Sequence, residues 1–203
     1  MGEDFFAGVE RVKVKYDGGE SYMPIFYRDA RSFTFMMPAN WFALRKLLPD
    51  PRFQPVQAMP GVGMVALTAF EYQDTDIGPY NEFSVGIVLN NPLYFPLPCY
   101  NMLRQYLAKF YYVYVRHLPV TTEIALRAGV DFYNFPKIIA DIDFEDDDNN
   151  VKCTLTHNGQ KILAMSGVKI PTEPFGEMKF ICQLYMNRQP QQAEFKLNVS
   201  KGA

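Results

Sequence analysis

Two side chains stand out because their types and positions could support nucleophilic and proton-transfer chemistry. Lys137 follows Pro136 and leads directly into a run of alternating polar and apolar residues, the period of two that is typical of a half-buried strand. Glu82 lies at a similar place, at the entrance of the apolar run 83–89. A neutral lysine amine is a nucleophile, and a carboxylate can transfer protons. The competing interpretation is that Lys137 extends into water, as most lysines that open a strand do.

The alternation after Lys137 predicts which side chains share a face of this strand. One face is predicted to hold Ile138, Ala140, Ile142 and Phe144, and the other Lys137, Ile139, Asp141 and Asp143. A lysine at the mouth of such a strand would point into a cavity if one lies there.

Other kinds of catalytic or metal site find little support. The chain has two histidines and no GxSxG segment, which argues against a Ser-His-acid triad. His117 and His157 lack HExxH-type spacing, and Gly61-Val62-Gly63 lacks the third glycine of a dinucleotide fingerprint. Residues 141–148 carry six carboxylates but no turn glycine, so they predict a solvated hairpin end rather than a calcium loop. We therefore expect no metal and no cofactor.

Composition sets the class of protein. A chain of 203 residues with 48% hydrophobic residues predicts one domain, 1–203, with a substantial core. The 17 Phe and 13 Tyr favour strands and an aromatic interior. A net charge of −2 offers no basic face for nucleic acid.

The start of the chain has no secretory-signal pattern, and the longest apolar run, 110–115, is too short to span a bilayer. We therefore expect a soluble, cytoplasmic protein with no membrane partner. The three cysteines, Cys99, Cys153 and Cys182, form no CxxC pair, which predicts reduced core thiols.

The elements that must position Lys137 and Glu82 are mostly strands. Besides the strand that begins at 137, strands are predicted at 12–16, 22–28, 33–37, 64–72, 83–89, 110–115, 151–157, 161–168 and 178–186. Tight turns are predicted at Asp17-Gly18-Gly19 and at Asn158-Gly159. Helices are predicted at 41–48 with Asn40 as the N-cap, at 100–109, and from Thr121-Thr122-Glu123 to Gly129. Trp41, Leu44, Leu47 and Leu48 are expected to share the packed side of the first helix, and the polar tail from Asn187 is expected to be mobile.

The chain resembles the acetoacetate decarboxylase family in four segments that occur in family order and span roughly residues 25–170. The segments are Ala43-Leu44-Arg45-Lys46-Leu47-Leu48-Pro49, Gly78-Pro79-Tyr80-Asn81-Glu82, Leu118-Pro119-Val120-Thr121-Thr122-Glu123 and Phe135-Pro136-Lys137. The resemblance implies a mainly β (α+β) fold, with a largely antiparallel cone- or barrel-like sheet and a few short helices, assembled into homo-oligomers. It also implies an active-site lysine that forms a Schiff base with a small keto acid. Lys137 falls on that lysine, and Glu82 falls on an acidic residue of the family's active site.

The implied chemistry fits these residue types. A neutral amine condenses with the carbonyl of a β-keto acid, the iminium accepts electrons as carbon dioxide leaves, and the enamine is protonated and hydrolysed. An ordinary lysine is almost wholly protonated at neutral pH, so burial or a nearby positive charge has to favour the neutral amine. Acetoacetate decarboxylase itself is a standard example of such activation.

The sequence departs from the family pattern at several polar positions. Many members carry a second lysine after the reacting one, where this chain has Ile138 on the opposite face, so activation of the amine must come from burial or from a distant cation. The family's active-site arginine aligns without gaps to Ala30. Arg28 shares the face of Ala30, and a one-residue bulge would bring in Arg31 instead, so both arginines are predicted to bind substrate.

Two further family positions are altered. A family glutamate is replaced by Leu67, and a Gly-Arg-Glu segment corresponds to Gly129-Val130-Asp131. The leading prediction is a decarboxylating lyase that forms a Schiff base through Lys137, with Glu82 as its companion. The alternatives are a Schiff-base aldolase or dehydratase acting on keto acids, and a non-catalytic member of the fold that binds a small molecule.

Overall fold

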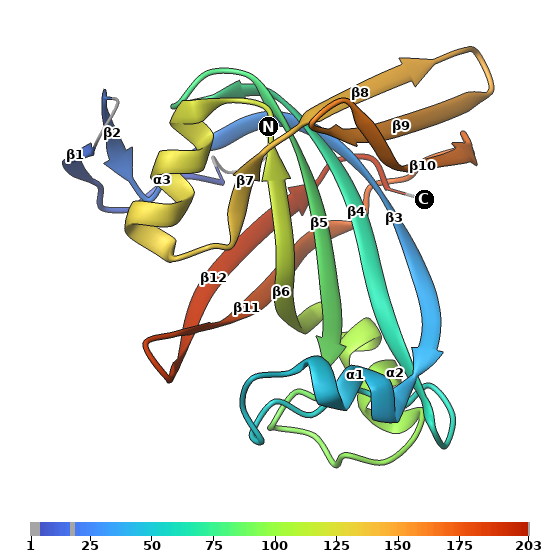
Figure 1. Ribbon diagram of the computed structural model, residues 1–203. Coiled ribbons are helices and arrows are strands. Elements are labelled where there is room, and N and C mark those ends of the chain that lie inside the picture. The colour runs from blue at the N-terminus through green and yellow to red at the C-terminus, as the bar shows by residue number, and fades with distance from the viewer. Residues whose placement is uncertain (1–4, 17–18, 203) are drawn as a thin grey trace. The chain divides into compact units, whose positions relative to one another are not determined.

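The computed structural model describes residues 5–16 and 19–202, which form mostly strands together with three short helices (Figure 1). The predicted mainly β class is therefore confirmed. The helices are α1 (Trp41–Leu47), α2 (Tyr100–Ala108) and α3 (Glu123–Tyr133). The strands are β1 (Val12–Tyr16), β2 (Gly19–Met23), β3 (Tyr27–Asn40), β4 (Val62–Thr75), β5 (Tyr80–Leu89), β6 (Phe110–Val120), β7 (Lys137–Ile139), β8 (Asp141–Asp146), β9 (Asn150–His157), β10 (Gln160–Val168), β11 (Gly176–Met186) and β12 (Gln189–Val199).

The described strands form three sheets. The largest has the order β12-β11-β6-β5-β4-β3, with β7 also paired to β6, and the two smaller sheets are β10-β9-β8 and β1-β2. The pairs β1–β2, β8–β9, β9–β10 and β11–β12 are antiparallel. Strand β6 pairs in parallel with β11 near its start and with β7 at its end. The segment β6-α3-β7 is thus a strand–helix–strand unit, and this unit delivers Lys137.

The chain gathers into two compact units, each assembled from three separate segments. Unit 1 comprises residues up to 33, 69–83 and 118–171, and unit 2 comprises 34–68, 84–117 and 172 onward. The single domain expected from composition remains a prediction.

The core of unit 1 brings together side chains from β4, β5, β6 and α3. Its buried members are Ile25, Tyr72, Ile77, Tyr80, Val120, Ala125 and Ala128. The predicted Asn158-Gly159 hairpin is confirmed, because both residues have positive φ (51° and 73°) between the antiparallel strands β9 and β10. Strands β1 and β2 also pair as a hairpin, but Asp17 and Gly18 of the predicted turn lie outside the described residues.

In unit 2 the first helix begins as predicted. The Asn40 side chain accepts a hydrogen bond from the Ala43 amide (2.9 Å) and caps α1. Leu44 and Leu48 are buried, whereas Leu47, expected on the same packed side, is exposed. The expectation for Leu47 was therefore wrong.

The end of the chain also differs from the expected mobile tail. Asn187 and Arg188, both with positive φ, turn the chain into β12, which pairs with β11 along its whole length. Apolar residues at every second position of β12, from Ala193 to Val199, carry the signal of a strand, although polar neighbours obscure it.

The three cysteines have different surroundings. Cys153 is fully buried, and burial raises the pKa of its thiol to about 12. Cys182 is partly buried, while Cys99 is exposed, so the prediction of a core thiol was wrong for Cys99. Separately, none of the helices in the described part of the chain is long and apolar enough to cross a membrane.

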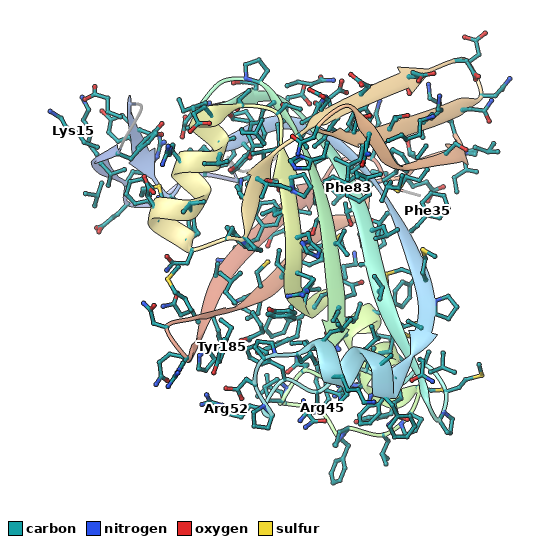
Figure 2. The ribbon with its side chains drawn as sticks, in the orientation of Figure 1. Lys15, Phe35, Arg45, Arg52, Phe83 and Tyr185 are labelled. Atoms are coloured by element: carbon teal, nitrogen blue, oxygen red, sulfur yellow. The ribbon has the colours of Figure 1, made fainter. Side chains whose placement is uncertain are left out.

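Asp50 lies in the loop after α1 and accepts hydrogen bonds from two arginines, Arg45 and Arg52. Both arginines are labelled in Figure 2. The Asp50 carboxylate accepts hydrogen bonds from the Arg52 guanidinium (2.7 and 2.9 Å) and from the Arg52 amide (2.8 Å). These hydrogen bonds lower the pKa of the Asp50 carboxyl from about 3.8 to about 2. The bonds from the Arg52 side chain have the largest effect, followed by the bond from the Arg52 amide.

A lowered carboxyl pKa predicts acid sensitivity of the fold. The stabilising effect of Asp50 is present above its unfolded pKa and is lost as the pH falls through about 2. We expect Asp50→Asn to lower the free energy of unfolding at pH 7 and to flatten its fall between about pH 4 and pH 2, measured by urea denaturation across that range. Asp148→Asn, at an exposed acid, is the control. Equal pH profiles for wild type and Asp50→Asn would contradict the assignment.

Candidate active site

Strand β7 runs beside β6 (Figure 1). Their parallel pairing places Lys137 opposite Leu118. The Leu118 amide donates to the Pro136 carbonyl (3.3 Å), and the Ala140 amide donates to Val120 (3.0 Å). The lysine side chain is only 5% exposed. It therefore does not extend into water.

The predicted alternation holds only in part. Ile138 and Ile139 are 43% and 41% exposed, whereas Ala140 and Ile142 are buried as expected. The prediction for Ile138 was wrong because β7 ends at Ile139 and the chain then enters β8 in a different sheet. Lys137 is 5% exposed although Ile139, predicted on the same face, is 41% exposed, so burial does not follow the predicted alternation within β7.

Helix α3 provides the surface against which the lysine packs. Thr122 caps its start as predicted, but the helix runs through Gly129 to Tyr133 and ends at Asn134, which has a positive φ of 55°. The prediction that Gly129 ends this helix was therefore wrong. A Cβ atom on Gly129 would lie 2.3 Å from Lys137 Cε and 3.0 Å from Nζ. The glycine is needed for this close approach rather than for a helix end.

Glu82 is fixed by its neighbours at the start of β5. The Asn81 amide donates to Thr121 Oγ1 (2.9 Å), and the Thr121 amide donates to the Asn81 carbonyl (3.1 Å). The Asn81 side chain donates to the Ile142 carbonyl in β8 (2.8 Å). These bonds connect the strand that carries Glu82 to the segments on either side of Lys137.

The two sequence-predicted residues meet inside unit 1. Lys137 Nζ donates a hydrogen bond to Glu82 Oε2 at 2.8 Å, and the two side chains are 5% and 9% exposed. A buried ion pair is costly to desolvate and is retained only where geometry and further hydrogen bonds support it. The burial and the short distance mark this pair as a candidate site.

Three tyrosines that the sequence did not single out surround the pair. The Tyr72 hydroxyl donates to Glu82 Oε1 (3.4 Å), and the Tyr80 ring lies 5.5 Å from Lys137 Nζ. The hydroxyls of Tyr27 and Tyr80 lie 3.3 Å apart. Burial, and secondarily the charge of Glu82, raises the pKa of both Tyr27 and Tyr80 above that of an ordinary tyrosine. Both phenols therefore stay neutral at physiological pH.

One of these tyrosines could have been found from spacing. Tyr80 and Glu82 are two residues apart on one strand, so they share a face. Tyr27 and Tyr72 come from other strands, and no local pattern brings them to Glu82.

Arg28 and Arg31, predicted to bind substrate, make ion pairs elsewhere in unit 1. Arg28 pairs with Asp74 and Asp76, and Arg31 with Glu71 and Asp146. No described contact joins either arginine to Lys137 or Glu82. Their role in substrate binding remains a prediction.

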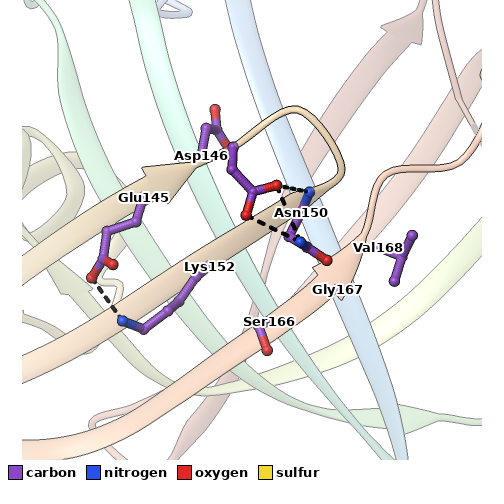
Figure 3. A pocket seen from close by; sticks show the side chains of 8 residues that line it. Glu145, Asp146, Asn150, Lys152, Ser166, Gly167 and Val168 are labelled. Carbon is purple, nitrogen blue, oxygen red and sulfur yellow. Dashed lines mark hydrogen bonds and ion pairs between the residues drawn. The ribbon is translucent and has the colours of Figure 1, made fainter.

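Two surface hollows are lined by residues other than Lys137 and Glu82. One of about 490 Å³, shown in Figure 3, is formed by β8, β9 and β10, where Glu145 pairs with Lys152. Another, of about 210 Å³, is lined in unit 2 by Phe53, Tyr112 and Gln183. Neither of these two hollows is lined by Lys137 or Glu82. Over the described ranges, no group of three or more His, Cys, Asp or Glu is arranged to hold a metal ion.

The fold agrees with the comparison to known families. The family model described as acetoacetate decarboxylase (ADC) matches residues 12–188, and the chain belongs to this family. No curated protein sequence matches the chain significantly.

Solved structures show the same fold at low sequence identity. Acetoacetate decarboxylase from Legionella pneumophila subsp. pneumophila str. Philadelphia 1 is 12% identical, with a TM-score of 0.60 over 96% of this chain and 72% of that chain. A second acetoacetate decarboxylase is 14% identical, with a TM-score of 0.61 over 86% of this chain and 68% of that one. The enduracididine biosynthesis enzyme MppR, in complex with the condensation product of pyruvate and imidazole 4-carboxaldehyde, is 12% identical, with a TM-score of 0.53 over 81% and 66% of the two chains. At these identities the likeness concerns the fold.

The close approach of α3 to the lysine predicts the effect of a single methyl group. Gly129→Ala gains about 1 kcal/mol of helix propensity but places Cβ inside the space of Lys137 Cε, so the amine must leave its position beside Glu82. We expect the melting temperature of Gly129→Ala to be no higher than that of the wild type. We also expect at least about a tenfold loss of Lys137 reactivity toward a carbonyl probe, measured by reductive labelling and peptide mapping. Asp131→Ala, at an exposed position of the same helix, is the control and should label normally. Unchanged labelling of Gly129→Ala would contradict the proposed packing.

Proposed function

We propose that this protein is a Schiff-base-forming lyase in which Lys137 condenses with a small β-keto acid and carbon dioxide is released. The observation that carries the proposal is the buried pair of Lys137 Nζ and Glu82 Oε2, 2.8 Å apart and packed against Gly129. Membership of the acetoacetate decarboxylase family supports it.

The proposed reaction uses groups that are already in contact. Glu82 accepts a proton from the Lys137 ammonium, and the neutral Nζ attacks the carbonyl carbon of the substrate. Loss of water forms an iminium ion. The electron pair of the bond to the carboxylate carbon then moves into the iminium, which gives carbon dioxide and an enamine. Protonation of the enamine carbon and hydrolysis by water release the ketone and restore the amine.

In this scheme Glu82 acts as the proton acceptor and donor at the nitrogen. Its carboxylate is oriented by two hydrogen bonds, one from Lys137 to Oε2 and one from Tyr72 to Oε1. Because the pair is nearly sealed from water, the proton moves between fixed groups rather than to bulk solvent.

A second candidate function is aldol or dehydration chemistry through the same iminium. One observation bears on the choice: decarboxylation requires a carboxylate on the substrate, whereas aldol or dehydration chemistry does not, and none of the described contacts of Lys137 and Glu82 comes from a second cation that would hold one. The similar fold of MppR, seen with a condensation product of pyruvate and an aldehyde, adds support. Assembly into a homo-oligomer and a cytoplasmic location remain predictions.

Reductive trapping tests the proposed imine. We expect sodium borohydride, added with acetoacetate or pyruvate, to fix an adduct on Lys137 that peptide mass mapping locates, because reduction makes the carbon–nitrogen bond permanent. Lys137→Arg should abolish that adduct, whereas Lys161→Arg, at an exposed lysine, should not. Absence of an adduct with every carbonyl compound tried would favour a binding protein without catalysis.

Measurement of carbon dioxide then separates the two kinds of enzyme. Release of carbon dioxide from acetoacetate that requires Lys137 supports decarboxylation. An adduct without carbon dioxide release supports aldol or dehydration chemistry, and full turnover by Lys137→Arg would overturn both.

A further inference from the structure

The described contacts of Lys137 and Glu82 join one ammonium to one carboxylate, and among the described residues of unit 1 none of these contacts comes from a second cation. Resting on the imine chemistry proposed above, we infer a preference of this site among carbonyl substrates. It accepts small ketones and aldehydes that carry no charged group more readily than keto acids of the same size. The inference concerns the substrate class, and the reaction that follows imine formation is a separate matter.

The charges of the pair can be followed through the reaction. A protonated Lys137 beside an ionised Glu82 sums to zero, and an iminium ion on the same nitrogen beside Glu82 also sums to zero. A neutral ketone adds no charge to this pair. A keto acid adds one negative charge to a pair that already sums to zero, in a place where little water screens it.

The other groups at the site do not offset that charge. Tyr27 and Tyr80 are neutral phenols, because burial and the charge of Glu82 raise their pKa values. The Tyr80 ring, 5.5 Å from Nζ, attracts a cation through its negative face and does not attract an anion. Tyr72 directs its hydroxyl to Glu82 Oε1.

Most other cations of unit 1 are held by carboxylates outside the site. The residues in such pairs are Arg11, Lys13, Arg28, Arg31, Arg127, Lys152 and Lys169. Lys15 and Lys161 are exposed. The residues outside the described ranges include no Lys, Arg or His side chain.

The consequence is selectivity against a negative charge on the substrate. A buried carboxylate with no counter-ion is strongly disfavoured, whereas a neutral group of similar size is not. If a β-keto acid does react, the same penalty is relieved when carbon dioxide leaves. The ketone product should then bind more tightly than the keto acid.

A matched pair of probes tests this inference. Levulinate and methyl levulinate carry the same ketone at one end. At the other end levulinate has a negatively charged carboxylate, and methyl levulinate has an uncharged methyl ester. We expect borohydride trapping at Lys137 to be on the order of tenfold greater for the methyl ester, after division by the rates measured with Nα-acetyllysine. Trapping at exposed Lys161 in the same digest should show no such preference and serves as an internal control.

Each outcome separates the inference from the function on which it rests. Equal trapping, or a preference for levulinate, would overturn the inference while leaving imine chemistry in place. Trapping of neither probe, nor of any other carbonyl compound, would overturn the imine itself. Glu82→Gln removes the repelling charge, so the preference for the ester should shrink even if both rates fall. An unchanged ratio in this variant would contradict the role given to the charge of Glu82.

Discussion

The buried ion pair between Lys137 and Glu82 is the interaction on which the rest of the site depends. Removing either partner would leave one charge buried without the other, which is far more costly than the pair itself. The fold meets this constraint with several long-range connections. The β6-α3-β7 unit sets the position of the lysine, and hydrogen bonds from Asn81 set the strand that carries the glutamate. Gly129 then leaves the space that the lysine side chain needs.

The same arrangement explains how one pair could serve both stability and chemistry. A carboxylate that neutralises an ammonium is also placed to receive its proton when a carbonyl compound arrives. Tyr27 and Tyr80 have raised pKa values and remain neutral, so they surround the pair without adding charge. Under the proposal above, this neutrality narrows the range of substrates, because none of the described contacts of the pair comes from a cation that would hold an acid group. The departures from the family pattern that the resemblance implies, with Ile138 after the lysine and, in a gap-free register, Ala30 at the arginine position, would point in the same direction.

Much of the local structure could be predicted from the sequence, because local signals produce it. The N-cap at Asn40, the Asn158-Gly159 hairpin and the strand that begins at Lys137 all depend on neighbouring residues, whereas β5 begins at Tyr80 and so includes Glu82 rather than starting after it. The meeting of Glu82 with Lys137 could be anticipated only through the family resemblance, because it needs β5 and β7 to pair with the same strand, β6. Gly129 does not end a helix, although the sequence predicts that it does. A glycine is needed at this position because the side chain of Lys137, eight residues further along the chain, packs against it, and no local pattern shows that contact. The tyrosines from β3 and β4 reach the site through sheet order, which no local pattern encodes.

The most direct test of the central claim is to observe the carbon–nitrogen bond itself. Protein labelled with nitrogen-15 at lysine can be mixed with acetone labelled with carbon-13 at the carbonyl and studied by nuclear magnetic resonance. The proposed chemistry predicts an iminium carbon signal coupled to nitrogen in the wild-type protein, and no such signal in Lys137→Arg. If the wild-type protein at saturating acetone shows only the free ketone and its hydrate, Lys137 does not form an imine and the proposed function is wrong.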